Sequence, residues 1–159
     1  MAKLFILAFA ILALLACNQQ IKSDKVQQPT LYTIAQLDAR LQKVDSMVLV
    51  FYTNPLGTDS LRYTRYYKQY STTDTATIAF VKAQLNDTAT KIEKVKPCRS
   101  EGKIWCFANG NIVQTLYFSS YSDACSHLYI IYNGFFYYAG INPSFIDLLK
   151  TIKSKAVTP

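Results

Sequence analysis

Two Asn-Gly dipeptides constrain the fold of this chain more than any other feature of its sequence. Asn109-Gly110 and Asn133-Gly134 each stand between runs rich in aromatic and β-branched residues. Asn-Gly is the strongest short signal for a β-hairpin, because both central residues of a type I′ turn need positive φ. We therefore expect two tight hairpins. The expected cross-strand pairs are Phe107 with Ile112, Trp105 with Gln114, Ile131 with Phe136, and Tyr129 with Tyr138.

The other segments predict three helices and two further strands. Each expected helix has an apolar stripe at helical spacing behind a capping residue: Thr33, then Thr73 or Asp74, then Asn142. Segment 61–71 is ambiguous, because its tyrosines fit one helical face but also alternate as in a strand. We favour the strand, since a capped helix follows directly. The predicted elements are a helix over 33–44, strands over 47–53 and 61–71, a helix within 72–86, hairpins over 103–118 and 127–140, and a helix over 142–152.

This order of elements predicts an α+β fold, in which an antiparallel sheet carries helices packed on a face. Half of the 159 residues are apolar and 17% are charged. That composition supplies enough apolar material for a core and is too apolar for a disordered chain. We expect a single domain over residues 31–155.

The N-terminus carries an uninterrupted apolar run. All twelve residues from Leu4 to Leu15 are apolar, with Lys3 before them and Ala16 and Cys17 after them. The run is too short for a helix that spans a hydrocarbon core of ~30 Å. A buried N-terminal helix is the alternative, but no polar residue interrupts the run as an amphipathic helix would require. The pattern is typical of a signal peptide, which we place over residues 1–16.

The segment Leu14-Leu15-Ala16-Cys17 resembles the lipobox of bacterial lipoprotein precursors. The resemblance implies that the Cys17 thiol takes a diacylglyceryl group, that the preceding peptide is removed, and that the new N-terminus is acylated, for example with palmitate. Two or three acyl chains are enough for stable anchoring. The polar, glutamine-rich residues 17–30 are then a flexible tether. Asn18 stands where aspartate retains lipoproteins in the inner membrane, so the resemblance implies the outer membrane of the cell envelope.

Three further cysteines, Cys98, Cys106 and Cys125, allow one disulfide in an exported domain. Cys106 lies about 13 Å along its strand from the open end of the first hairpin, whereas Cys98 and Cys125 flank that end. A disulfide needs Cα atoms within about 7 Å, so the spacing predicts a Cys98–Cys125 bond and a free, buried Cys106. Together with His127, the three cysteines have the number and type of side chains found in a Cys₃His zinc site. They lack the C-x2-C spacing of structural zinc sites, and we expect no metal or cofactor.

The second hairpin is apolar on both faces, and only one can pack beneath the helices. Either loop 54–60 or another helix covers the second face, or that face is partly exposed and binds a protein or an apolar ligand. Basic residues alternate with tyrosines over 62–70 in a chain of net charge +7. They indicate either a solvated edge strand or attraction to anionic lipid or an acidic partner. The candidate binding-face residues are Tyr129, Ile131, Phe136, Tyr138, Arg62 and Arg65.

Residues suited to catalysis are scarce. His127 is the single histidine, and the sequence has neither a G-x-S-x-G motif nor a glycine-rich phosphate loop. Ser119, Asp123 and His127 are close in sequence, but the members of a triad usually come from distant segments, so we expect no catalytic site. The sequence thus predicts a lipid-anchored, non-enzymatic envelope protein with a binding or structural role, for which an envelope protein is a candidate partner and nucleic acid is not. The alternatives are an inhibitor or immunity-type protein against an envelope enzyme, and a carrier of a small apolar ligand.

Overall fold

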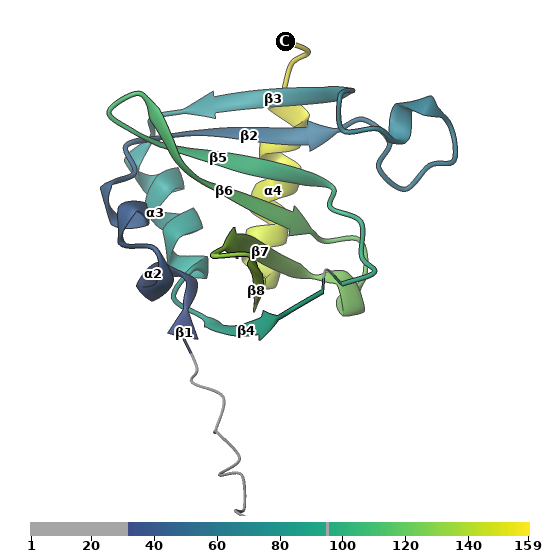
Figure 1. Ribbon diagram of the computed structural model, residues 1–159. Coiled ribbons are helices and arrows are strands. Elements are labelled where there is room, and N and C mark those ends of the chain that lie inside the picture. The colour runs from purple at the N-terminus through teal and green to yellow at the C-terminus, as the bar shows by residue number, and fades with distance from the viewer. Residues whose placement is uncertain (1–31, 95) are drawn as a thin grey trace, which may run out of the picture. The chain divides into compact units, whose positions relative to one another are not determined.

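Eight antiparallel strands in the described residues form one sheet with helices, which confirms the predicted α+β fold (Figure 1). The computed structural model describes residues 32–94 and 96–159. The expected signal peptide 1–16, the tether 17–30 and Cys17 lie outside the described residues. The spatial order of the strands is β1-β4-β8-β7-β6-β5-β2-β3. Their bounds are β1 Tyr32–Thr33, β2 Ser46–Tyr52, β3 Tyr67–Thr72, β4 Thr88–Ile92, β5 Gly102–Ala108, β6 Asn111–Ser119, β7 His127–Tyr132 and β8 Phe135–Gly140.

The hydrophobic core is formed by residues of the helices and of the strands. The helices are α2 (Ile34–Leu37), α3 (Thr75–Gln84) and α4 (Pro143–Lys155), and Figure 1 shows α4 behind the central strands. No helix of the described part is long and apolar enough to cross a membrane. The core is built from alternate strand residues and from the apolar helix faces. Its larger members include Leu49, Phe51, Ile104, Leu116, Phe118, Leu128, Ile130, Ile78, Val81, Phe145, Leu149 and Ile152.

Each Asn-Gly dipeptide joins two paired strands. The φ angles are 51° and 76° at Asn109-Gly110, and 49° and 79° at Asn133-Gly134. The register of β7 and β8 places Ile131 opposite Phe136 and Tyr129 opposite Tyr138, and Phe107 of β5 lies opposite Ile112 of β6.

The expected pairing of Trp105 with Gln114 is wrong. The β5–β6 register shifts between Cys106 and Phe107, so that Trp105 lies opposite Thr115 and Cys106 opposite Gln114. An extra residue on one strand, here Val113, moves every pair beyond it by one position.

The helix expected over 33–44 is interrupted at Asp38. Its first turn has the predicted capping box, in which Thr33 and Gln36 exchange hydrogen bonds. After Leu37 the chain continues as a 3-10 helix, Ala39–Lys43, whose N-cap is Asp38. The break places the Asp38 carboxylate in the protein interior, where it needs hydrogen-bond donors.

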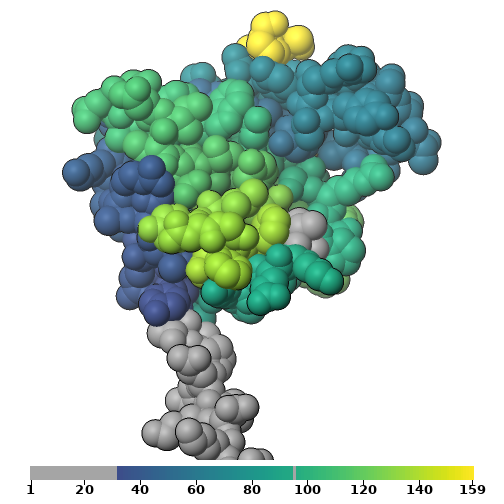
Figure 2. Space-filling model, in the orientation of Figure 1, coloured from purple at the N-terminus to yellow at the C-terminus, as the bar shows by residue number. Residues whose placement is uncertain are grey.

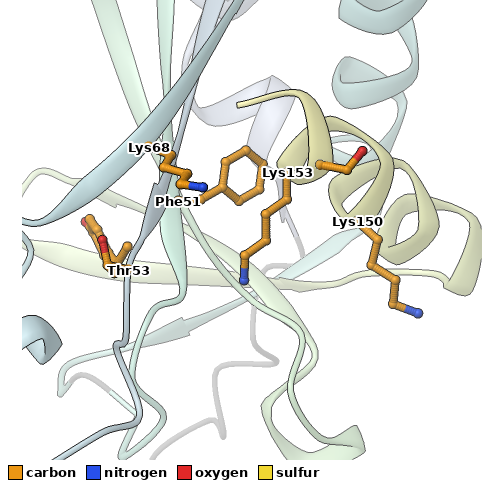
Figure 3. A pocket seen from close by; sticks show the side chains of 7 residues that line it. Phe51, Thr53, Lys68, Lys150 and Lys153 are labelled. Atoms are coloured by element: carbon orange, nitrogen blue, oxygen red, sulfur yellow. The ribbon is translucent and has the colours of Figure 1, made fainter. Parts of the chain in front are cut away.

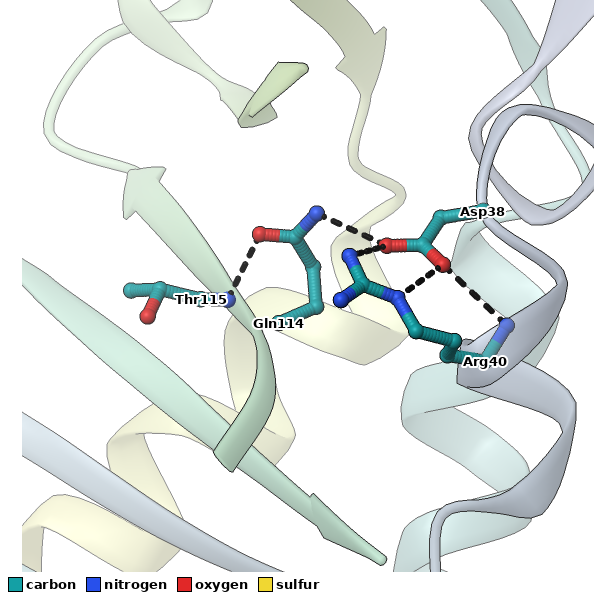
Figure 4. Close-up of polar contacts among 4 residues, drawn as sticks. All are labelled: Asp38, Arg40, Gln114 and Thr115. Atoms are coloured by element: carbon teal, nitrogen blue, oxygen red, sulfur yellow. Dashed lines mark hydrogen bonds and ion pairs between the residues drawn. The ribbon is translucent and has the colours of Figure 1, made fainter. Parts of the chain in front are cut away.

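Asp38 receives those donors from two directions (Figure 4). Arg40 donates from its backbone N at 3.1 Å, from Nε at 2.8 Å and from Nη2 at 2.7 Å, and Gln114 of β6 donates from Nε2 at 3.0 Å. The Arg40 side chain lowers the pKa of Asp38 more than burial raises it. This cluster fastens the first helical segment to the sheet, which is a structural role.

The strand expected over 61–71 begins only at Tyr67. Residues 60–62 form a 3-10 turn capped by Asp59, so Arg62 and Arg65 lie in the loop before β3 and not on an edge strand. The backbone of β3 is shielded at Gln69, which exchanges two hydrogen bonds with Val157 at 2.8 and 3.0 Å. The sheet edge is thus partly covered by the C-terminal residues.

Candidate functional site

The loop between β2 and β3, residues 53–66, projects from the side of the sheet (Figures 1 and 2). Its shape is fixed by hydrogen bonds. Asn54 N donates to Leu61 O at 3.3 Å, and Leu61 N donates to the Asp59 carboxylate at 3.0 Å. Arg99, far along the chain, donates to the carbonyl oxygens of Pro55 and Gly57 at 3.1 and 3.4 Å. A projecting loop with this many backbone bonds is preorganised for contact.

The same loop exposes large apolar and basic side chains. Leu56 and Tyr63 are each 49% exposed and Leu61 is 41% exposed. The guanidinium of Arg62 lies 5.2 Å from the centre of the Tyr63 ring, and that of Arg65 lies 5.6 Å from the same ring. Cation–π contacts hold the arginines in place while leaving their charge available. Exposed tyrosine and arginine side chains of this kind are typical of protein interfaces.

Three adjoining concavities surround the base of this loop. Their volumes are about 550, 500 and 260 Å³. Tyr52 lines the first and third, and Arg62 lines the second and third, so neighbouring hollows share a lining residue. No carboxylate is among their lining residues, whereas six basic side chains are: Arg62, Arg65, Lys68, Arg99, Lys150 and Lys153. This end of the domain therefore favours anionic groups.

The smallest concavity has a floor of tyrosines. Tyr52, Tyr117 and Tyr129 line it together with Ser100. The Tyr117 and Tyr129 rings stack with centroids 4.9 Å apart. Burial, followed by the nearby Tyr117 and Tyr129 hydroxyls, raises the pKa of Tyr52 to about 12. The Tyr52 phenol therefore stays protonated at neutral pH and can donate a hydrogen bond.

The six candidate binding-face residues do not form one exposed surface. Tyr129 and Tyr138 are buried, because the segment between β4 and β5 covers them. Lys96 N donates to the Tyr138 hydroxyl at 2.9 Å, and the hydroxyls of Ser100 and Tyr129 lie 3.2 Å apart. The cover thus comes from a segment that the sequence did not single out. Ile131 is exposed and Phe136 is half-buried on the strands, while Arg62 and Arg65 lie apart from them on the β2–β3 loop.

A cysteine pair links the segment between β4 and β5 to the 3-10 turn that precedes β7. The Sγ atoms of Cys98 and Cys125 lie 2.09 Å apart, within bonding distance, and their Cα atoms are 5.6 Å apart. Cys106 is buried and unbonded among the described residues, and burial raises the pKa of its thiol to about 12. A thiol that stays protonated is a poor nucleophile and metal ligand. In the described residues no group of three His, Cys, Asp or Glu side chains could hold a metal ion.

Ser119 and His127 lie directly opposite each other on β6 and β7, and both are buried. The Ser119 hydroxyl and His127 Nδ1 have no hydrogen-bond partner in the described structure, and Asp123 is exposed on a separate 3-10 turn. The three residues therefore do not form the hydrogen-bonded chain that a triad needs. The His127 ring packs instead against Tyr138, with centroids 5.0 Å apart.

The burial of His127 makes stability depend on pH. Burial, and then the positive charge of Lys96, lowers the pKa of His127 to about 4, compared with ~6.5 in an unfolded chain. Between these values the unfolded chain binds a proton that the folded protein does not. The free energy of unfolding should therefore be unaffected above pH ~6.5 and fall by about 3 kcal/mol as the pH drops towards 4.

Urea denaturation at a series of pH values measures this loss. His127 is the single histidine, so the slope between pH ~6.5 and ~5 belongs to it, because carboxylates titrate lower. The His127→Phe variant should have a flat profile in that range. A slope that survives in the variant would contradict the assignment.

Sequence reasoning missed much of this basic end. Arg99, Lys150 and Lys153 carry no local signal, because they belong to segments far along the chain from the loop that they approach. Runs of basic residues with tyrosine were the only signal, and they pointed to Arg62, Arg65 and Lys68. No protein-family model, no curated protein and no solved structure matches this chain.

Proposed function

We propose that this chain is a non-enzymatic envelope lipoprotein whose domain binds a protein partner through the β2–β3 loop. The observation that carries the proposal is the shape of that loop. It is fixed by hydrogen bonds at its base, yet it exposes Leu56, Leu61 and Tyr63 to solvent. Fixed apolar side chains on a projection lose little entropy on binding, which makes them suitable anchor residues.

The charge around the loop indicates the chemistry of the partner. Arg62 and Arg65 flank the apolar side chains, and no carboxylate lines the concavities beside them. An acidic surface would be attracted to this end and oriented by it. Inhibition of an envelope enzyme is a second candidate function, favoured by the same projection, which could enter a cleft. A carrier of an apolar ligand is less well supported, because basic side chains line the concavities.

Anchoring rests on the lipobox resemblance at Cys17, with the outer membrane as the proposed location. Residues 17–30 allow the domain to reach at most about 50 Å from the lipid. In a bacterial host with lipoprotein processing, the chain should partition into detergent and gain the mass of its acyl groups. Cys17→Ser should abolish both properties. An unlipidated Cys17 in the wild-type protein would exclude the anchoring proposal.

Partner binding is tested by placing a photo-crosslinking residue at Leu61 in the native host. The matched control carries the same residue at Ile112, which is also exposed, at 53%, but lies on the β5–β6 hairpin. We expect one stoichiometric protein adduct from position 61 and none from position 112. If the captured protein is an enzyme that the purified domain inhibits, the second candidate is favoured. Equal labelling from both positions, or no adduct from either, would contradict the proposed interface.

A further inference from the structure

The largest of the three concavities lies beside the loop, where β2 and β3 meet the last turns of α4 (Figure 3). It has a volume of about 550 Å³. The buried Phe51 ring is among its lining residues, and in Figure 3 Lys68 and Lys153 lie beside this ring, whereas Lys150 points away from it. The residues that line it are Phe51, Tyr52, Thr53, Lys68, Lys150, Lys153 and Ser154.

Two of the three lysines have no counterion in the described structure. Lys150 pairs with Asp147 at 3.2 Å, and both side chains are more than 70% exposed. Lys68 and Lys153 make no ion pair or hydrogen bond with the described residues through their amino groups. Two ammonium groups that share a concave site repel each other unless an anion lies between them. Both side chains are exposed, and an anion placed between them would relieve this repulsion.

The dipole of α4 does not account for this arrangement. Basic side chains near a helix C-terminus are favourable there, and this explains Lys153 and Lys155 in the last turn. It does not explain Lys68, which projects from β3, a different element 85 positions earlier in the chain. Lys155 does not line the concavity. The helix dipole therefore does not explain why Lys68 and Lys153 line the same pocket.

We propose that this pocket binds a phosphate group, with Lys68 and Lys153 as its charged ligands. Lysine acts as a point charge towards phosphate, and a phosphate with up to two negative charges matches two unpaired ammonium groups. Ser154 also lines the pocket, but its hydroxyl donates to Thr151 O at 2.7 Å and is therefore not a donor to the phosphate. The Phe51 ring gives the organic part of a phosphate-bearing molecule an apolar surface. This site is separate from the protein interface proposed above, and either can fail without the other.

The test uses the full chain with Cys17→Ser, so that no acyl group contributes to binding. Inorganic phosphate is titrated at about 0.15 M salt, where the Debye length is about 8 Å and diffuse attraction is weak. Amide chemical shifts at Thr53, Lys68 and Ser154 should change and saturate. Lys68→Gln and Lys153→Gln should each weaken binding about tenfold or more. Lys155→Gln is the matched control, since it removes the same charge from the same helix, and its affinity should be unchanged.

A second arm identifies the source of the phosphate. The same chains are sedimented with phosphatidylcholine vesicles that contain or lack phosphatidylglycerol. Saturable phosphate binding without sedimentation identifies a soluble phosphate compound. Sedimentation that needs phosphatidylglycerol, Lys68 and Lys153 identifies a lipid headgroup. The proposal is overturned if neither probe binds, or if Lys155→Gln weakens binding as much as Lys153→Gln does.

Discussion

Replacing Cys98 and Cys125 by serine should lower the free energy of unfolding by about 3 kcal/mol. The two residues are 27 positions apart, and a cross-link over a loop of that length removes about this much chain entropy from the unfolded state. The effect should be large for a domain of this size, because total stabilities are typically about 5–15 kcal/mol. Urea denaturation of the oxidised protein and of the double variant measures the difference.

Reduction provides the matched control. A thiol reductant should destabilise the wild-type protein by the same amount and leave the double variant unchanged, because Cys106 forms no bond that could be reduced. Release of Cys98 should also loosen the segment that covers Tyr129 and Tyr138. Both tyrosines should then become more reactive towards iodination. Equal stability of the oxidised protein and the double variant would show that this bond contributes nothing.

The parts of the fold that were predicted depend on local chemistry. Asn142 begins α4 because its side chain accepts a hydrogen bond from Phe145 N at 2.8 Å, and Pro143 can occupy the first helical position without losing a bond. The capping box of Thr33 and Gln36 is local in the same sense. Such signals lie within four residues of one another, so they can be recognised without the rest of the chain.

The parts that were missed depend on distant partners. Strand β4 has the sequence TATKI and little apolar character. It is a strand because Thr90 and Ile92 pair with Tyr138 and Phe136 of β8. The helix break at Asp38 likewise depends on Gln114, which is 76 residues away. Propensity along the chain cannot report contacts of this kind, since tertiary pairing overrides it.

In the candidate site, too, some residues have a local sequence signal and others depend on distant contacts. The alternation of basic residues and tyrosines marked Arg62 and Arg65 in the sequence, but their position on a projecting loop follows from the late start of β3. Lys153 becomes relevant only because α4 packs against the end of β2 and β3. Surface charge is tolerated at many positions and leaves no periodic signature, so its convergence is visible only in the folded structure.

Gly102→Ala should be among the most destabilising single substitutions, with an expected loss of about 3 kcal/mol. Gly102 lies opposite Phe51 of β2 and Phe118 of β6. A Cβ atom at Gly102 would overlap the Val50 carbonyl oxygen and the Phe118 ring. Neither can move easily, because β2 is paired on both sides and Phe118 is packed in the core. Well-packed interiors respond to one added methyl group with strain, since few voids can absorb it.

Gly140→Ala is the matched control for this prediction. Gly140 also lies in a strand, β8, but nothing is within 4 Å of the position that its Cβ would take. Alanine at an unstrained position should change stability little or raise it by up to about 1 kcal/mol, because it reduces the entropy of the unfolded chain. Urea denaturation of both variants should therefore give effects of different size and, where Gly140→Ala stabilises, of opposite sign. If the two substitutions cost the same, the close approach of β5 to Val50 and Phe118 would be refuted.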